Sequence, residues 1–188
     1  MQPLKKIVAI GPEGTGKSSL CEMLASHYNA CWCPEYAREY LLKYGTNYSY
    51  NDLEVIAKGQ INLEAAFIQK AEQSTVNGQR STVNRPLLFI DTDMYVMKVW
   101  CEYVFGKCHH LILEEIAKRK YDLYLLCNTD LPWVADELRE YPDEATRNEL
   151  FKMYKDILVQ QHTPWVEIKG GAEERCNIAI AAVDNLLK

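Results

Sequence analysis

Short apolar runs alternate with longer segments of helical periodicity along most of this chain. The apolar runs predict buried strands, at residues 6–10, 30–33, 87–90, 123–127 and 165–168. The segments between them repeat apolar residues at spacings of three and four, which predicts helices, at residues 19–28, 34–44, 51–73, 94–105, 111–118, 143–161 and 172–187. This alternation predicts an α/β fold whose parallel sheet of about five strands has helices on both faces.

Two polar segments interrupt this pattern. Residues 74–85 contain the sequence Ser-Thr-Val-Asn twice, and a repeat of this length is too short for a repeat architecture. The polar character of the segment predicts a surface loop. Residues 129–147 follow the fourth predicted strand and begin irregularly, which predicts a lid over a ligand site. We expect residues 1–188 to form one domain, because 188 residues of which 48% are hydrophobic suit a single core.

The sequence GPEGTGKS at residues 11–18 has the spacing G-x-x-x-x-G-K-[ST] of a P-loop. It follows the first predicted strand and opens the first predicted helix, which is the order that a P-loop requires. In such loops glycines allow backbone N–H groups to face phosphate oxygens, and the helix adds its positive end. We expect ATP to be bound by Glu13, Gly14, Thr15, Gly16, Lys17, Ser18 and Ser19. Lys17 is expected at the β- and γ-phosphates and Ser18 on Mg²⁺.

Acidic residues follow the third predicted strand. Asp91 directly ends the apolar run, as in a Walker B element, and is expected to support Mg²⁺ directly or through water. Asp93 is a candidate catalytic or substrate-binding residue, with a helix N-cap as the alternative. P-loop ATPases that hydrolyse ATP commonly carry Glu directly after the Walker B Asp, whereas this chain has Thr92. That difference favours phosphoryl transfer to a bound acceptor.

Further candidates for the acceptor site follow the second predicted strand, where ligands bind in open parallel sheets. Glu35 is expected to accept the proton of an acceptor hydroxyl or to hold substrate hydroxyls, and Asp93 is the second candidate for the base. Arg38 lies one turn after Glu35, and a salt-bridged first helical turn is the alternative for this pair. Aromatic candidates for stacking on a flat ring, with core packing as the alternative, are Trp32, Tyr36, Tyr95 and Trp133.

The lid and the last turn carry the remaining candidates. Arg139 and Arg147 of the lid could close onto the transferring phosphates, with solvated surface arginines as the alternative. Gly171, in the glycine pair after the last predicted strand, would let the backbone approach an adenine. A simple turn between strand and helix is the alternative for Gly171.

Charge and composition narrow the classes of partner. Lys and Arg total 21 against 26 Asp and Glu, a net charge of −5, which argues against sequence-independent binding of nucleic acid. No apolar run approaches the ~20 residues that span a membrane, and the first residues do not resemble a signal peptide. The seven cysteines are typical of reduced cytosolic thiols. We therefore expect a cytoplasmic protein with a small-molecule substrate, and a homo-oligomer is compatible with the sequence.

Taken together, these motifs resemble the nicotinamide riboside kinase domain at the C-terminal end of the bifunctional regulators of bacterial NAD synthesis. The shared segments are GPEGTGKS at 11–18, PEYAREY at 34–40, DTD at 91–93, DLPW at 130–133 with Asp136 and Arg139, and the glycine turn before Glu174 and Arg175. The resemblance implies a P-loop NTPase of the nucleoside and nucleotide kinase type. It also implies transfer of the γ-phosphate of ATP to the 5′-hydroxyl of nicotinamide riboside, and it places Arg175 at the nucleotide.

One feature of that family is missing from this sequence. The longer regulators carry an adenylyltransferase domain with an H-x-G-H motif, which does not occur here. We therefore expect a kinase standing alone that makes nicotinamide mononucleotide. Two alternatives remain, namely a P-loop kinase for another nucleoside or small metabolite, and a non-catalytic module that senses ATP.

Overall fold

The computed structural model describes residues 2–76, 82–83 and 85–188, in which strands and helices alternate. The strands are β1 (Lys5–Ile10), β2 (Cys31–Cys33), β3 (Leu87–Asp91), β4 (Leu123–Cys127) and β5 (Trp165–Ile168). The helices are α1 (Lys17–Tyr28), α2 (Tyr36–Tyr44), α3 (Tyr50–Val76), α4 (Met94–Phe105), α5 (His110–Lys118), α6 (Glu144–Gln160) and α7 (Ala172–Leu187). The strands form one parallel sheet of five strands, as the sequence predicts. Their order in the sheet is β2-β3-β1-β4-β5.

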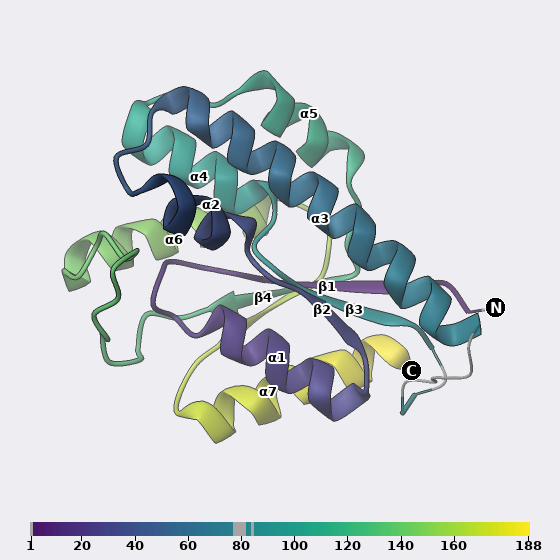
Figure 1. Cartoon of the computed structure of the whole chain (residues 1–188). Coiled ribbons are helices and arrows are strands. Elements are labelled where there is room, and N and C mark those ends of the chain that lie inside the picture. Colours follow the sequence, from purple (N-terminus) through teal and green to yellow (C-terminus); the bar gives the residue numbers. More distant parts are fainter. Residues whose placement is uncertain (1, 77–81, 84) are drawn as a thin grey trace.

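Two layers of helices cover the sheet. Helices α1 and α7 lie on one face, and α3, α4 and α6 are among the helices that lie on the other (Figure 1). Alternate residues of the central strand β1 serve the two layers, because successive side chains of a strand point to opposite faces. Ile7 and Ala9 pack towards α1 and α7, whereas Val8 and Ile10 pack towards α6.

The boundaries of several elements differ by a few residues from those predicted, and the differences in β2, α2 and α3 bear on the site or on the predicted loop. Strand β2 begins at Cys31, and α2 begins after Glu35, so that Glu35 occupies the N-cap position of the helix. Helix α3 continues to Val76, into the segment predicted as a loop, because the first helix breaker after that point is Gly78.

The rest of the predicted loop 74–85 is described only in part. Residues 77–81 and 84 lie outside the described residues. The backbone N–H of Thr82 donates to the carbonyl of Tyr28 at 3.0 Å, and Val83 packs against the apolar core. The described part of this loop is therefore anchored to the end of α1.

The parallel strands bring several loops to one edge of the sheet. The P-loop follows β1, Glu35 follows β2 and Asp91 ends β3, and these strands are neighbours in the order β2-β3-β1. Residues 129–143 of the predicted lid have no regular helix or strand, and α6 begins at Glu144, where the Asp143 carboxylate accepts from the Thr146 N–H at 2.7 Å.

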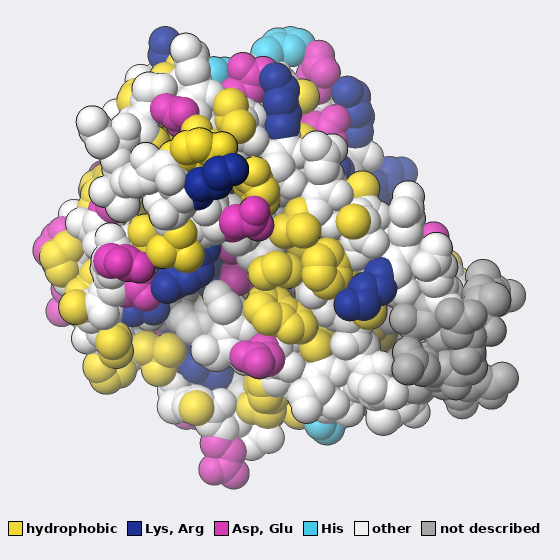
Figure 2. Space-filling model, viewed as in Figure 1, with side chains coloured by type: hydrophobic (Ala, Val, Ile, Leu, Met, Phe, Trp, Pro, Cys, Tyr) yellow, Lys and Arg dark blue, Asp and Glu magenta, His cyan; other side chains and the backbone are white. Residues whose placement is uncertain are grey.

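The distribution of surface charge is relevant to nucleic-acid binding, and the length and apolar character of the helices are relevant to membrane insertion. Figure 2 shows Lys and Arg side chains interspersed with acidic and apolar side chains on the face in view, rather than gathered in a basic stripe. Among the residues that the structure describes, none of the helices combines the length and the apolar character that spanning a bilayer requires.

Candidate active site

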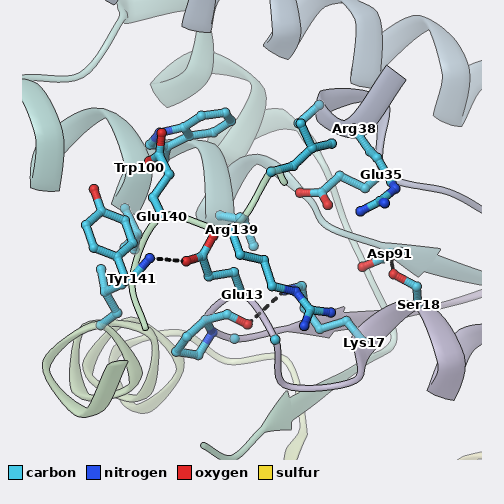
Figure 3. A pocket seen from close by; sticks show the side chains of 18 of the residues that line it. Glu13, Lys17, Ser18, Glu35, Arg38, Asp91, Trp100, Arg139, Glu140 and Tyr141 are labelled. Atoms are coloured by element: carbon cyan, nitrogen blue, oxygen red, sulfur yellow. Dashed lines mark hydrogen bonds between the residues drawn. The ribbon is translucent and has the colours of Figure 1, made fainter. Parts of the chain in front are cut away.

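A cavity of about 430 Å³ lies above the P-loop. Its walls come from the P-loop, the segment after β2, the end of β3, α4, α6 and the segment before α6 (Figure 3). Its volume falls within the range of about 300–1,000 Å³ typical of small-molecule sites. The cavity thus joins segments that are far apart in the sequence, at the edge of the sheet where ligands of this fold class bind.

The P-loop turns tightly before α1. Gly14 and Gly16 have φ angles of +70° and +78°, which side-chain-bearing residues rarely adopt. A Cβ atom on Gly14 would also lie 3.0 Å from the ring of Trp133. Lys17, at the first turn of α1, is 9% exposed and donates from Nζ to the carbonyl of Pro12 at 3.0 Å (Figure 3). An ammonium group therefore lies beside a helix N-terminus, the arrangement that binds phosphate.

Ser18 and Asp91 form a pair of oxygen ligands at the floor of the cavity. Oγ of Ser18 donates to Oδ2 of Asp91 at 2.5 Å. The Asp91 side chain is 1% exposed, and this burial raises the pKa of its carboxyl, although the charge of Lys17 acts in the opposite direction. A buried carboxylate beside a hydroxyl is the oxygen-rich, negatively charged environment that Mg²⁺ favours, so these residues fit that ion.

Glu35 is tied to Asp91 through Thr92. The hydroxyl of Thr92 lies 3.3 Å from Oε1 of Glu35 and 3.5 Å from Oδ1 of Asp91. Thr92 has a φ of +74°, an unfavourable conformation for a β-branched residue and one found at functional sites. Burial and the charge of Asp91 raise the pKa of the Glu35 carboxyl. A raised pKa suits a group that accepts a proton from a hydroxyl near neutral pH.

Gln60 of α3 connects the segment that carries Glu35 with the segment that carries Thr92. Its side chain is 1% exposed, and its Nε2 donates to the carbonyl of Thr92 at 3.2 Å. Its Oε1 accepts from the backbone N–H of Tyr36 at 2.7 Å. Gln60 thus links the segments that follow β2 and β3. The sequence gives no sign of this role, since the residue lies within a regular helical pattern.

Several aromatic side chains line the cavity. They include Trp100 and Tyr103 of α4, Tyr141 of the lid and Tyr154 of α6. Figure 3 shows Trp100 and Tyr141 at the end of the cavity away from Asp91. Trp32, which the sequence suggested as a stacking residue, also lines the cavity. The other aromatic lining residues were not predicted, because helical periodicity does not separate cavity-lining positions from core positions.

Polar contacts hold the predicted lid over the cavity. Nη1 and Nη2 of Arg38 donate to the two carboxylate oxygens of Asp136 at 3.3 and 3.1 Å. The carboxylate of Glu13 accepts from the backbone N–H of Tyr141 (Figure 3), and burial raises the pKa of the Glu13 carboxyl. Arg139 lines the cavity and donates to the carbonyl of Val134. The lid segment therefore contacts both the P-loop and α2.

Two predicted substrate residues lie outside the cavity because they belong to another buried cluster. Oδ1 of Asp93 accepts from the backbone N–H groups of Tyr95 and Val96 at 2.9 and 3.4 Å, and Oδ2 accepts from the Tyr124 hydroxyl at 2.8 Å. The alternative reading of Asp93 as an N-cap therefore describes its position. The ring of Tyr95 packs against that of Tyr124 with centroids 5.7 Å apart. Neither residue lines the cavity.

Two further aromatic candidates are also outside the cavity lining. The ring of Tyr36 packs against Gly59 of α3, so closely that a Cβ atom there would overlap it. Trp133 lies over Gly14, and the guanidinium carbons of Arg139 and Arg147 are 5.7 and 5.3 Å from its ring. Trp133 therefore packs on the outside of the P-loop rather than on an acceptor.

The remaining arginines have mainly structural contacts. Arg147 is 4% exposed and donates to the carbonyl of Thr129 at 3.1 Å. Arg175 is 5% exposed and donates to the carbonyls of Thr15, Asn128 and Gly170 at 3.0, 2.9 and 2.8 Å, and it pairs with Asp130. Gly171 is the N-cap of α7 and does not line the cavity. Arg175 supports the P-loop from behind instead of facing the cavity.

Comparison with known proteins gives three findings. The chain matches the model of the family described as AAA domain over residues 6–175. It is 25% identical over 170 residues to the trifunctional NAD biosynthesis/regulator protein NadR of Escherichia coli (strain K12), which covers 88% of this chain and 38% of that protein. The protein of the same name from Salmonella typhimurium matches with the same identity and coverage. The chain therefore spans less than half the length of these curated relatives.

The third finding concerns solved structures. A crystal structure of NadR in complex with NR has a TM-score of 0.74 at 23% identity, covering 97% of this chain and 50% of that chain. NadR in complex with NAD and AMP-PNP has a TM-score of 0.67 at 22% identity, over 97% and 49%. Thymidylate kinase from Ehrlichia chaffeensis has a TM-score of 0.63 at 13% identity, over 97% and 98%. These likenesses confirm the predicted P-loop kinase fold.

Proposed function

We propose that this chain, which belongs to the family described as AAA domain, is an ATP-dependent kinase that phosphorylates the 5′-hydroxyl of nicotinamide riboside. The products are nicotinamide mononucleotide and ADP. The observation that carries the proposal is that one cavity holds Lys17, the Ser18–Asp91 pair and Glu35 at one end and aromatic side chains at the other. The first group suits phosphoryl transfer, and the second suits a flat base.

In this proposal the P-loop binds ATP. Residues 13–19 surround its phosphates, with Lys17 balancing the charge of the γ-phosphate. Ser18 and Asp91 would hold Mg²⁺, which would neutralise charge on the phosphates. Arg139 lines the cavity from the lid and stabilises charge on the transferring phosphate. Arg175 acts indirectly, by fixing the carbonyl of Thr15 behind the loop.

Glu35 is the proposed base. Its carboxylate takes the proton of the acceptor 5′-hydroxyl as the new oxygen–phosphorus bond forms, and the bond between the γ-phosphorus and the bridging oxygen breaks to leave ADP. The position of Glu35 beside Asp91 and its raised pKa support this role. We favour Glu35 over Asp93, because hydrogen bonds from Tyr95, Val96 and Tyr124 occupy the carboxylate of Asp93.

The acceptor end of the cavity favours a nucleoside over a nucleotide. A phosphate on the acceptor requires cations, and Arg38, the cation nearest Glu35 in the chain, is paired in a bidentate manner with Asp136. The cavity lining also includes aromatic and apolar side chains, such as Trp100 and Tyr103, which suit a flat base. The similarity to NadR, which has been solved in complex with NR, supports nicotinamide riboside as that nucleoside.

A product assay tests the proposal. Purified protein is incubated with ATP, Mg²⁺ and, in separate reactions, nicotinamide riboside, uridine, cytidine, adenosine and thymidine monophosphate. We expect nicotinamide mononucleotide as the main product, and loss of turnover in a Lys17→Ala variant by a factor of about 10³. A greater rate with another acceptor would identify that acceptor, in place of nicotinamide riboside, as the substrate. ATP binding without turnover of any acceptor would support an ATP-sensing module instead.

A further inference from the structure

Trp100 and Tyr103 of α4 form an aromatic wall of the cavity. A series of hydrogen bonds joins this aromatic wall to the lid. Nε1 of Trp100 donates to the hydroxyl oxygen of Tyr48 at 2.8 Å, and that hydroxyl donates to Oε2 of Glu140, also at 2.8 Å. Trp100 and Glu140 both line the cavity, whereas Tyr48 lies behind them in the segment between α2 and α3. Three segments of the chain thus converge on one carboxylate.

The direction of these hydrogen bonds is fixed by chemistry. An indole nitrogen is only a donor, so the hydroxyl oxygen of Tyr48 must accept from Trp100. The single hydroxyl proton of Tyr48 is then directed to Glu140. The ring of Tyr48 also packs edge-on against Trp100, with centroids 4.9 Å apart. The carboxylate of Glu140, an exposed residue, is therefore linked to Trp100 through the hydroxyl of Tyr48.

The negative charge of Glu140 has no counter-ion within the described residues, as its one hydrogen bond there comes from a neutral hydroxyl. The cations that line the cavity are engaged elsewhere. Lys17 donates to the carbonyl of Pro12, Arg38 pairs with Asp136, and Arg139 donates to the carbonyl of Val134. Figure 3 shows Glu140 and Trp100 at one end of the cavity and Asp91 and Ser18 at the other.

We propose that Glu140, positioned by Tyr48 and Trp100, is the specificity residue that selects an acceptor whose aromatic ring carries a positive charge. A cation over an aromatic face beside a carboxylate gains from both neighbours, whereas a neutral ring gains only from the aromatic wall. The inference rests on the proposed function, because it concerns the base of the nucleoside acceptor. It adds a residue that distinguishes nicotinamide riboside from uncharged nucleosides.

The test compares two acceptors of nearly the same shape. Nicotinamide riboside carries a pyridinium charge, and 1,4-dihydronicotinamide riboside is its uncharged reduced form. For wild type, Glu140→Gln and Tyr48→Phe, kcat and KM are measured with both acceptors at saturating ATP. Glu140→Gln keeps an acceptor for the Tyr48 hydroxyl and removes only the charge. Glu137→Gln is the matched control, since Glu137 is an exposed carboxylate of the same segment that does not line the cavity.

We expect Glu140→Gln to lower kcat/KM for nicotinamide riboside about tenfold, mainly through KM, and to change the reduced acceptor less than about twofold. Tyr48→Phe should shift the ratio of the two acceptors in the same direction by a smaller factor, because the charge remains but is no longer held. Glu137→Gln should leave the ratio as in the wild type.

Two results overturn the inference, and they are distinguishable. If the wild type phosphorylates both acceptors and Glu140→Gln affects them equally or not at all, Glu140 does not recognise the charge and the proposed function stands. If the wild type phosphorylates neither acceptor, the proposed function fails and the inference fails with it.

Discussion

The hydroxyl of Ser18 and the carboxylate of Asp91 lie 2.5 Å apart although 73 residues separate them in the chain. The sheet brings them together, because β3 pairs with β1 in a register that places Asp91 beside Ala9. Ser18 then follows from the turn of the P-loop into α1. The proposed metal site is therefore a consequence of strand order.

The first prediction concerns this pair. Asp91→Asn removes the charge that Mg²⁺ requires while keeping the size of the side chain. We expect Mg²⁺ to strengthen ATP binding in the wild type and to have little effect in the variant, measured by titration with and without EDTA. Asp156→Asn, at an exposed position of α6, serves as the control. If Asp91→Asn retained the full effect of Mg²⁺, Asp91 would not hold the ion.

The second prediction separates the two acidic candidates for the base. Glu35→Gln should lower the single-turnover rate by a factor of about 10²–10⁴, the usual contribution of a general base. Asp93→Asn should remain within a few-fold of the wild type, since Asn can also cap a helix and Asp93 does not line the cavity. Rapid-quench measurements with bound ATP give both rates. A larger loss of rate in Asp93→Asn than in Glu35→Gln would assign the role of general base to Asp93.

The third prediction is a pH dependence of stability. Burial raises the pKa of Asp93 to about 7, from a value of 3.8. Between these values the folded state binds a proton that the unfolded state does not, so this group makes stability fall as pH rises. From pH 5 to pH 8 the wild type should lose about 2–3 kcal/mol relative to Asp93→Asn. Urea denaturation at both pH values measures the difference, and parallel curves for the two proteins would contradict the raised pKa.

The fourth prediction concerns Arg175. Arg175→Met keeps the length of the side chain but removes donors to three backbone carbonyls and the ion pair with Asp130. We expect a loss of about 1–3 kcal/mol in the free energy of unfolding, because buried carbonyl groups lose their donor, whereas the ion pair adds little since the Asp130 side chain is 36% exposed. The free energy of unfolding of Arg175→Lys should lie between those of Arg175→Met and the wild type, because one ammonium group cannot reach all of these partners. Equal stability of all three proteins would show that these contacts contribute nothing.

The parts of the molecule that follow from local spacing were predictable. The P-loop is specified by eight consecutive residues. It follows the apolar run of β1, and Asp91 ends the apolar run of β3. The cavity wall was not predictable to the same degree. Trp100 lies in a helix in which core and cavity positions share one periodicity, and Gln60 looks like an ordinary helical residue until the tertiary contacts are known.

Asp93 and Arg175 were candidates for the site but do not line the cavity, and the same reason explains both cases. A carboxylate just after a strand can be either a ligand residue or the N-cap of the next helix, and Asp93 has the contacts of the second. An arginine near a glycine turn can contact a nucleotide or the backbone around it, and Arg175 contacts the backbone. In both cases only the three-dimensional partners decide.

The central claim is that the P-loop binds a triphosphate, and titration calorimetry with ATP and Mg²⁺ tests it most directly. The account predicts that the folded wild type binds ATP at a single site and that folded Lys17→Ala, verified by circular dichroism, binds at least about tenfold more weakly. A folded wild-type protein that releases or absorbs no heat with ATP at several temperatures, and does not retain ATP in equilibrium dialysis, would contradict the account.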